Sequence, residues 1–126
     1  MLFRSRPIYS PWMWESRSDN GAKSWGACVR GPLPGYACTM LPHETASGAV
    51  VIGGRLPGLG LHCSFDDGKS WQTWQADRSF WAMGTMYEVE PDLILWVYMD
   101  NRAGNARGQF IRVTKDGLEP AREMMP

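Results

Sequence analysis

The segment Ser64-Phe65-Asp66-Asp67-Gly68-Lys69-Ser70-Trp71 has the composition of a β-hairpin turn that makes its own hydrogen bonds. The Asp66 carboxylate can accept hydrogen bonds from turn amides, and Gly68 tolerates a positive φ. Trp71 can fold back onto the strands as an apolar plug. These structural roles account for every residue type in the pattern S-x-D-x-G-x-S-W. The segment therefore predicts a fold rather than an activity.

A degraded copy of this pattern lies 46 residues earlier, in Ser18-Asp19-Asn20-Gly21-Ala22-Lys23-Ser24-Trp25. Asn20 and Ala22 stand at the aspartate and glycine positions, and the turn is expected to survive both changes. A period of this length is typical of one four-stranded propeller blade and indicates radial repetition. Residues 113–117 lie about one period further on, keep only the Asp-Gly turn, and form a weak third copy.

Alternation of apolar and polar residues predicts short strands between these turns. We expect the last two strands of one blade, all four of the next and the first three of a third. The outer strand of this third blade is expected to be missing or very short. A polar turn over residues 43–48 should join the first two strands of the complete blade. The expected strands are 12–16, 24–29, 36–41, 49–56, 60–65, 70–75, 82–89, 93–99 and 109–114.

The composition agrees with an all-β chain and excludes one class of partner. The 126 residues, 44% hydrophobic and 21% charged, suit a single globular domain over residues 1–126. Fourteen Gly, nine Pro and seven Trp favour short strands, frequent turns and several packed faces. Thirteen basic and thirteen acidic residues cancel, so we expect no nucleic-acid partner.

The sequence has no evident export signal or membrane segment. Residues 1–7 lack an apolar h-region, and the strongly apolar run 93–99 is far too short to cross a bilayer. We therefore expect no membrane partner and, by default, a cytoplasmic location.

The cysteines and histidines do not predict a metal site. Cys28, Cys38 and Cys63 are odd in number and form no Cys-x-x-Cys pair, so neither a disulfide framework nor a zinc site is indicated. His62 and Cys63 are neighbours on a strand and should point to opposite faces, which prevents shared ligation. His43 falls in the polar turn. We expect structural roles for both histidines and no cofactor.

The hairpin pattern resembles the Asp-box of the sialidase (BNR-repeat) superfamily. The resemblance implies a β-propeller whose blades carry the hairpin between their third and fourth strands. Residues 53–59, 86–92 and 112–120 are also similar to segments of that superfamily. The residues to which the resemblance assigns the structural role are Ser64, Asp66, Gly68, Ser70, Trp71, Ser18, Asn20 and Trp25.

The chain is short for the architecture that it resembles. A six-bladed propeller needs more than twice this length, and 126 residues at a period of 46 hold fewer than three blades. We therefore expect an all-β partial propeller of two to three antiparallel four-stranded blades. Exposed strand edges and blade faces would favour aggregation, so self-association into a dimer or trimer is expected to complete the ring. The alternative is a fragment of a larger propeller.

The resemblance also implies a site: arginines that clamp a substrate carboxylate, a tyrosine nucleophile helped by a glutamate, and an aspartate acid/base. Arg55, followed by Leu-Pro-Gly, and Arg107, preceding Gly-Gln-Phe-Ile-Arg, are the positions most like the clamp. Both fall where inner strands should end. Tyr87 and Glu88 are the catalytic candidates. Adjacent strand residues point to opposite faces, so at most one of them can face a central channel, and we favour Glu88. No residue matches the acid/base aspartate. Ion pairing with nearby acids is the structural alternative for both arginines.

These observations favour a non-catalytic propeller module that binds a glycan or another small acidic ligand. One alternative is a sialidase-type glycoside hydrolase whose site is completed across subunits. The other is a structural or protein-interaction remnant without a small ligand. Four tryptophans outside the hairpins could serve either as sugar platforms or as core residues, namely Trp12, Trp14, Trp74 and Trp81.

Overall fold

The computed structural model describes residues 12–34, 42–54, 59–77, 84–100 and 104–121. Over these residues the chain is all-β, with ten strands and no helix, which confirms the predicted fold class at this level. The chain divides into two compact units, Met1–Cys38 and Thr39–Pro126. The strands are β1 (Trp12–Glu15), β2 (Val29–Pro34), β3 (Pro42–Glu44), β4 (Val50–Gly54), β5 (Leu59–Ser64), β6 (Gln72–Asp77), β7 (Gly84–Glu90), β8 (Leu93–Asp100), β9 (Asn105–Thr114) and β10 (Gly117–Pro120).

The first unit contains one antiparallel pair, β1 and β2, in which Trp14 lies opposite Arg30. The expected first strand is present, but the second begins at Val29, where the predicted strand 24–29 ends. The residues between are exposed and belong to the loop, which is closed by the Gly26 N–H donating to the Arg17 carbonyl at 2.9 Å. Local alternation therefore placed this strand several residues too early.

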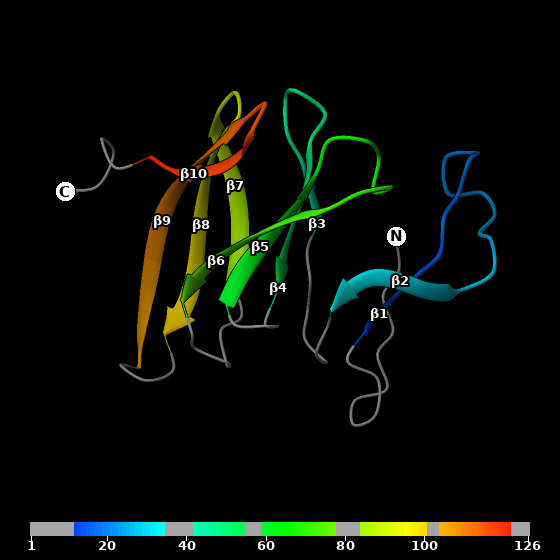
Figure 1. Cartoon of the computed structure of the whole chain (residues 1–126), viewed down its shortest axis with the longest axis horizontal. Coiled ribbons are helices and arrows are strands. Elements are labelled where there is room, and N and C mark those ends of the chain that lie inside the picture. The colour runs from blue at the N-terminus through cyan, green and yellow to red at the C-terminus, as the bar shows by residue number, and fades with distance from the viewer. Residues whose placement is uncertain (1–11, 35–41, 55–58, 78–83, 101–103, 122–126) are drawn as a thin grey trace. The chain divides into compact units, whose positions relative to one another are not determined.

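The second unit contains two four-stranded antiparallel sheets, ordered β3-β4-β5-β6 and β10-β9-β8-β7 (Figure 1). In each sheet the strands follow one another in chain order, so each is a simple meander. The second sheet has the short outer strand that the sequence predicts, since β10 has four residues. The expected strand 36–41 lies outside the described residues.

The turn between β3 and β4 is shorter than predicted. His43 is part of β3 and lies opposite Val51, so it belongs to the ladder rather than to the turn. The turn itself is closed by the Gly48 N–H, which donates to the Thr45 carbonyl at 2.8 Å. Gly48 has φ of 83°, which glycine adopts at little cost.

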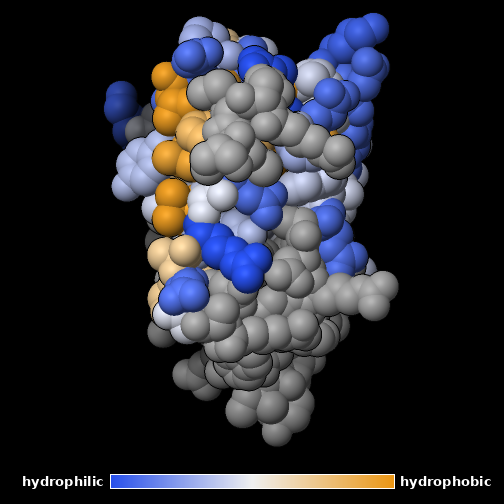
Figure 2. All heavy atoms as spheres, turned by 90° about the vertical axis from the view of Figure 1, so that its left-hand side faces the viewer, coloured by the Kyte–Doolittle hydropathy of each residue, from blue (hydrophilic) through white to orange (hydrophobic). Residues whose placement is uncertain are grey.

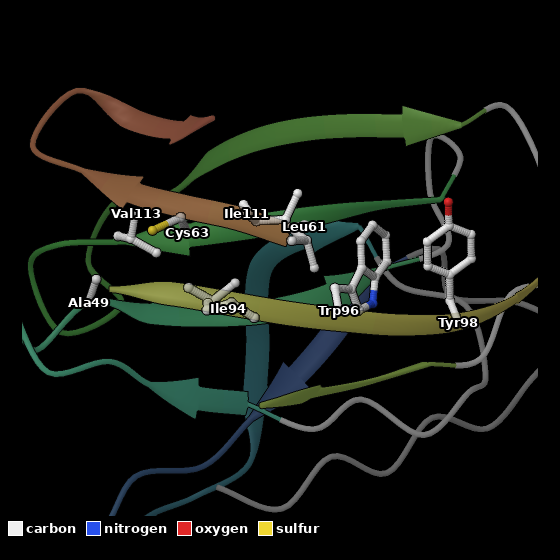
Figure 3. Packing of buried hydrophobic residues seen from close by; sticks show 9 residues of the cluster. Ala49, Leu61, Cys63, Ile94, Trp96, Tyr98, Ile111 and Val113 are labelled. Carbon is white, nitrogen blue, oxygen red and sulfur yellow. The ribbon is translucent and has the colours of Figure 1, made fainter. Parts of the chain in front are cut away.

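The two sheets of the second unit enclose one apolar core (Figure 3). Trp96 is at its centre: its ring lies edge-on to Trp74 with centroids 6.5 Å apart, and it packs against the Tyr98 ring at 4.7 Å. Burial of this layer, at roughly 25 cal/mol per Å² of apolar surface, is what holds the sheets together. The buried members are Ala49, Val51, Leu61, Cys63, Ile94, Trp96, Tyr98, Ile111 and Val113.

Backbone hydrogen bonds establish which face of each sheet lines this core. The Thr45 N–H donates to the Ala49 carbonyl at 2.9 Å, so the backbone groups of Ala49, and of Val51 two residues later, point towards β3. The Val113 N–H donates to the Asp92 carbonyl at 2.7 Å. The backbone groups of Asp92, and of Ile94 two residues later, therefore point towards β9.

These directions show that the two sheets meet with opposite faces. For L-residues, the side to which a residue's backbone groups point determines the face that carries its side chain. Core residues of β4 point their backbone towards the preceding strand, and core residues of β8 point theirs towards the following strand. The two meanders are therefore stacked in the same sense, rather than related face to face by a two-fold axis.

Candidate functional site

The predicted hairpin at residues 64–71 forms and is held by side-chain hydrogen bonds. The Ser64 hydroxyl donates to Asp66 Oδ1 at 2.9 Å and accepts the Gly68 N–H at 2.8 Å. Asp66 Oδ1 also accepts the Ser70 N–H at 2.8 Å, and Oδ2 accepts the Ser70 hydroxyl at 2.6 Å. Trp71 Nε1 donates to the Gly68 carbonyl at 3.1 Å. The turn is therefore ordered by its own side chains.

The hairpin has a strongly acidic carboxyl group, two residues with positive φ and a half-buried tryptophan. The hydrogen bonds from the Ser70 hydroxyl, the Ser70 N–H and the Ser64 hydroxyl lower the pKa of Asp66 to about 2. Asp67 and Gly68 both have positive φ, 59° and 77°. Trp71 is half-buried and contacts the turn through its Nε1 hydrogen bond to Gly68.

The degraded copy at residues 18–25 repeats the hydrogen bonds that Ser64, Asp66 and Ser70 make in the second hairpin. The Ser18 hydroxyl donates to Asn20 Oδ1 at 3.0 Å and accepts the Ala22 N–H at 2.9 Å. Asn20 Oδ1 accepts the Ser24 N–H at 3.0 Å. The remaining contact is reversed in direction, because Asn20 Nδ2 donates to the Ser24 hydroxyl at 2.7 Å. An amide therefore replaces the carboxylate without loss of the turn.

The third copy is a different kind of turn. Gly117 lies directly opposite Thr114, so Lys115 and Asp116 alone form the loop between β9 and β10. The Thr114 hydroxyl accepts the Asp116 N–H at 3.3 Å and donates to the Gly117 carbonyl at 3.2 Å. This pattern differs from that of the longer loops at 18–25 and 64–71. The position between third and fourth strands of the sheet is retained, but the hydrogen-bonded loop is not.

Glu88, the favoured catalytic candidate, joins the two sheets at their turns. Its Oε1 atom accepts the Ala46 N–H at 2.8 Å and the Asp92 N–H at 2.7 Å. Its Oε2 atom lies 3.4 Å from His43 Nε2, at ion-pair distance but outside hydrogen-bond geometry. The two backbone N–H groups lower the pKa of Glu88. Asp92 reinforces the contact by accepting the Ser47 N–H at 3.1 Å.

The structure does not bring the other candidates to Glu88. Tyr87 is on the opposite face of β7 and is 60% exposed. Glu88 lies opposite Ile94, whereas Arg107 is paired through β9 with Tyr98. Ile94 and Tyr98 are four positions apart on β8, which is about 13 Å along the strand. Glu88 and Arg107 therefore lie at different ends of the sheet.

Arg107 instead lies beside a row of aromatic and polar side chains. On the same face of β9, Gln109 Nε2 donates to the Tyr98 hydroxyl at 2.7 Å, and the Tyr98 ring packs on Trp96. Arg107 itself is exposed at the end of this row, near the start of β9 and not at the end of an inner strand as predicted. Sequence reasoning missed Gln109 and Tyr98, although alternation along β9 places Arg107 and Gln109 on one face. The second clamp candidate, Arg55, lies outside the described residues.

His62 is a fully buried polar side chain. Its Nδ1 atom and Thr73 Oγ1 share a hydrogen bond of 2.8 Å, while Nε2 has no hydrogen-bond partner. A Cβ atom added at Gly54 would lie 2.5 Å from Nε2, so only glycine fits beside this ring. Burial lowers the pKa of His62 to about 4. Its neighbour Cys63 points into the core between the sheets, as the alternation predicts.

The described residues contain no cluster of metal-ligating side chains and no helix capable of crossing a membrane. The tryptophans outside the hairpins divide between core and surface. Trp74 packs at the core, Trp14 is 38% exposed, and Trp12 carries the Arg30 guanidinium 4.2 Å above its ring. Trp81 lies outside the described residues.

Comparison with known proteins does not add to this picture. No family model matches the sequence, and no match was found among the curated proteins or the solved structures.

Asn20 in the first hairpin suggests a matched pair of substitutions at Asp66 in the second hairpin. Asp66→Ala should lower the urea midpoint of unfolding, because it removes an acceptor from the Ser70 N–H and hydroxyl. Asp66→Asn should have a much smaller effect, since Asn20 sustains the same turn. Chemical denaturation followed by tryptophan fluorescence measures both. Equal midpoints for wild type and Asp66→Ala would contradict a stabilising role for the carboxylate.

Removing the Glu88 carboxylate should destabilise the junction between the sheets. Glu88→Ala should cost about 1–2 kcal/mol of unfolding free energy, because two backbone N–H groups lose their acceptor. Glu88→Gln should cost less, since the amide keeps an oxygen at the Oε1 position. Exposed Glu90 on the same strand is the control, and Glu90→Ala should change stability by less than about 0.5 kcal/mol. A Glu88→Ala protein as stable as Glu90→Ala would refute this role.

His62 should make stability depend on pH in mildly acidic solution. Its folded pKa of about 4 lies below its ordinary value of 6.5, so the unfolded chain takes up a proton first as pH falls. Stability should therefore be constant above pH 6.5 with respect to this group and decline between pH 6.5 and 4. Urea midpoints across that window should fall less in His62→Asn than in the control His43→Asn. Parallel declines in the two variants would contradict the assignment.

Proposed function

We propose that this protein is a non-catalytic, sialidase-like β-propeller module that associates with further copies of itself and binds a glycan or another small acidic ligand. The observation that carries the proposal is the stacking of two consecutive four-stranded meanders with opposite faces. Blades of a propeller succeed one another in this way, because each is rotated about a common axis and none is turned over.

The hairpins give independent support to the propeller assignment. Loops of the same hydrogen-bonding pattern occur 46 residues apart, a blade-length period. The loop at residues 64–71 joins the third and fourth strands of its meander, β5 and β6. The Asp-box resemblance implies the same position. One two-stranded and two four-stranded sheets are fewer than the blades of a full propeller, which is why self-association belongs to the proposal.

The contacts of Glu88 favour binding without catalysis. A general base or a nucleophile's partner needs an accessible carboxylate oxygen, whereas Glu88 Oε1 is occupied by two backbone N–H groups. Tyr87 lies on the other face of β7 and cannot be activated by its neighbour. The hydrolase alternative would therefore need a tyrosine and a carboxylate from elsewhere.

The row ending in Arg107 supports an acidic sugar as the ligand class. A guanidinium pairs with a carboxylate through two parallel hydrogen bonds, and Tyr98 and Gln109 add hydroxyl and amide groups that suit sugar hydroxyls. The strand β4 ends at Gly54, directly before Arg55, so the second proposed arginine follows an inner strand in sequence.

Ligand binding and turnover can be tested on one preparation. A fluorogenic sialoside should release no fluorophore, whereas a glycan array should retain acidic glycans, and binding should be lost in Arg107→Ala and Arg55→Ala. Arg17→Ala, a substitution in the first unit, is the control and should bind as wild type. Turnover that is abolished by Glu88→Gln without a change in melting temperature would establish the hydrolase instead. Absence of both turnover and binding would favour the structural role.

A further inference from the structure

We infer that the outer face of the β7–β10 sheet is a docking surface for the β1–β2 sheet of a second copy of this chain, joined head to tail. The inference rests on the proposed propeller packing and deepens it, because it names the two surfaces that meet. In the proposed contact, the aromatic face of the β1–β2 sheet covers the apolar face of the β7–β10 sheet.

The face of the β7–β10 sheet that points away from the core is apolar from Leu95 to Met99 along β8, while a charged row of Glu90, Arg112 and Glu119 crosses its other end beside Leu93. Tyr87 is 60% exposed, Met99 49% and Val89 46%. Leu95 and Val97 lie between them on β8 and are only half-buried. Phe110, opposite Leu95, continues the face onto β9. Figure 2, which views the side on which β9 lies in Figure 1, shows apolar atoms gathered in a column along one flank. A contiguous apolar face of this kind is typical of an interaction site.

The packing inside the chain indicates what covers this face. The sheet β3–β6 contacts β7–β10 through one face, and β7–β10 contacts β3–β6 through the other, non-equivalent face. The outer face of β7–β10 therefore corresponds to the face with which β3–β6 binds its successor. The natural occupant is the sheet that would come next in the same stacking order, and the first sheet of a second copy fills that place.

The β1–β2 sheet has a surface suited to this role. One face of this sheet carries the buried side chains of Met13 and Leu33. The other face carries Trp14, which is 38% exposed and lies opposite Arg30. Arg30 stacks on Trp12, so this face presents indole rings and the flat side of a guanidinium. A two-stranded sheet is marginal by itself in water, so covering its aromatic face stabilises both partners.

A head-to-tail junction uses two different surfaces on every copy, which makes it separable by mutation. Light scattering after size-exclusion chromatography should give an oligomer for wild type. Tyr87→Glu/Met99→Glu should be monomeric because its docking face is charged, and Trp14→Glu should be monomeric because its covering face is charged. Phe65→Glu is the control, since Phe65 is 42% exposed on the hairpin loop, and it should remain oligomeric.

Mixing the two monomeric variants distinguishes head-to-tail docking from other modes. Each retains the surface that the other lacks, so the mixture should form a dimer with one intact junction and grow no further. A symmetric face-to-face dimer predicts instead that Trp14→Glu stays dimeric and that the mixture forms nothing new. Either of those results overturns the inference while leaving self-association intact. A wild type that is monomeric at all concentrations overturns both the inference and the assembly part of the proposed function.

Cross-linking keeps the inference testable if a charged variant does not fold. In a Cys28→Ser/Cys38→Ser background, Tyr87→Cys and Trp14→Cys chains should form a mixed disulfide dimer at least tenfold faster than either forms a homodimer. The matched pair Phe65→Cys and Trp14→Cys should show no such preference. Equal rates for the two pairs would count against docking of these faces.

Discussion

The apolar layer between the two four-stranded sheets is the constraint from which the rest of the second unit follows. Trp96 occupies the middle of this layer and contacts aromatic rings from its own strand and from β6. Since neither meander can bury its apolar face alone, the stacking of the two sheets is a condition for folding and not a later addition.

One end of this layer is organised by carboxylates that bind backbone N–H groups. Glu88 and Asp92 reach the turn between β3 and β4, and Asp66 orders the loop between β5 and β6. Turn amides cannot pair within a ladder, so side-chain acceptors satisfy them. The other end carries Arg107 and its polar neighbours. Separation of the two ends explains why residues that look like one catalytic set belong to two different environments.

Sequence reasoning succeeded where the interactions are local. The loop at residues 64–71 was predictable because every bond that holds it joins residues at most four positions apart. The meander strands β4 to β9 were predictable from the apolar pattern, and so was the opposite orientation of His62 and Cys63. The prediction failed at 24–29, where exposed residues leave no pattern, and at His43, which looks like a turn residue but pairs with Val51.

What could not be predicted depends on contacts between distant segments. Glu88 binds the N–H of Ala46, 42 residues away, and nothing in the local sequence marks that acceptor role. The row of Tyr98, Gln109 and Arg107 requires the register of β8 against β9, which alternation alone does not supply. The face that each sheet presents to the core likewise follows from hydrogen-bond direction, which becomes visible only in three dimensions.

The substitution of an amide for a carboxylate in the first hairpin gives the two loops different tolerance to acid. Protonation of Asp66 removes the charge that its three hydrogen bonds stabilise, whereas Asn20 has no proton to gain in the same range. In strongly acidic solution the loop at residues 18–24 therefore keeps all of its hydrogen bonds while the loop at residues 64–70 loses strength. Protonation therefore weakens one loop of the repeat and leaves the hydrogen bonds of the other unchanged.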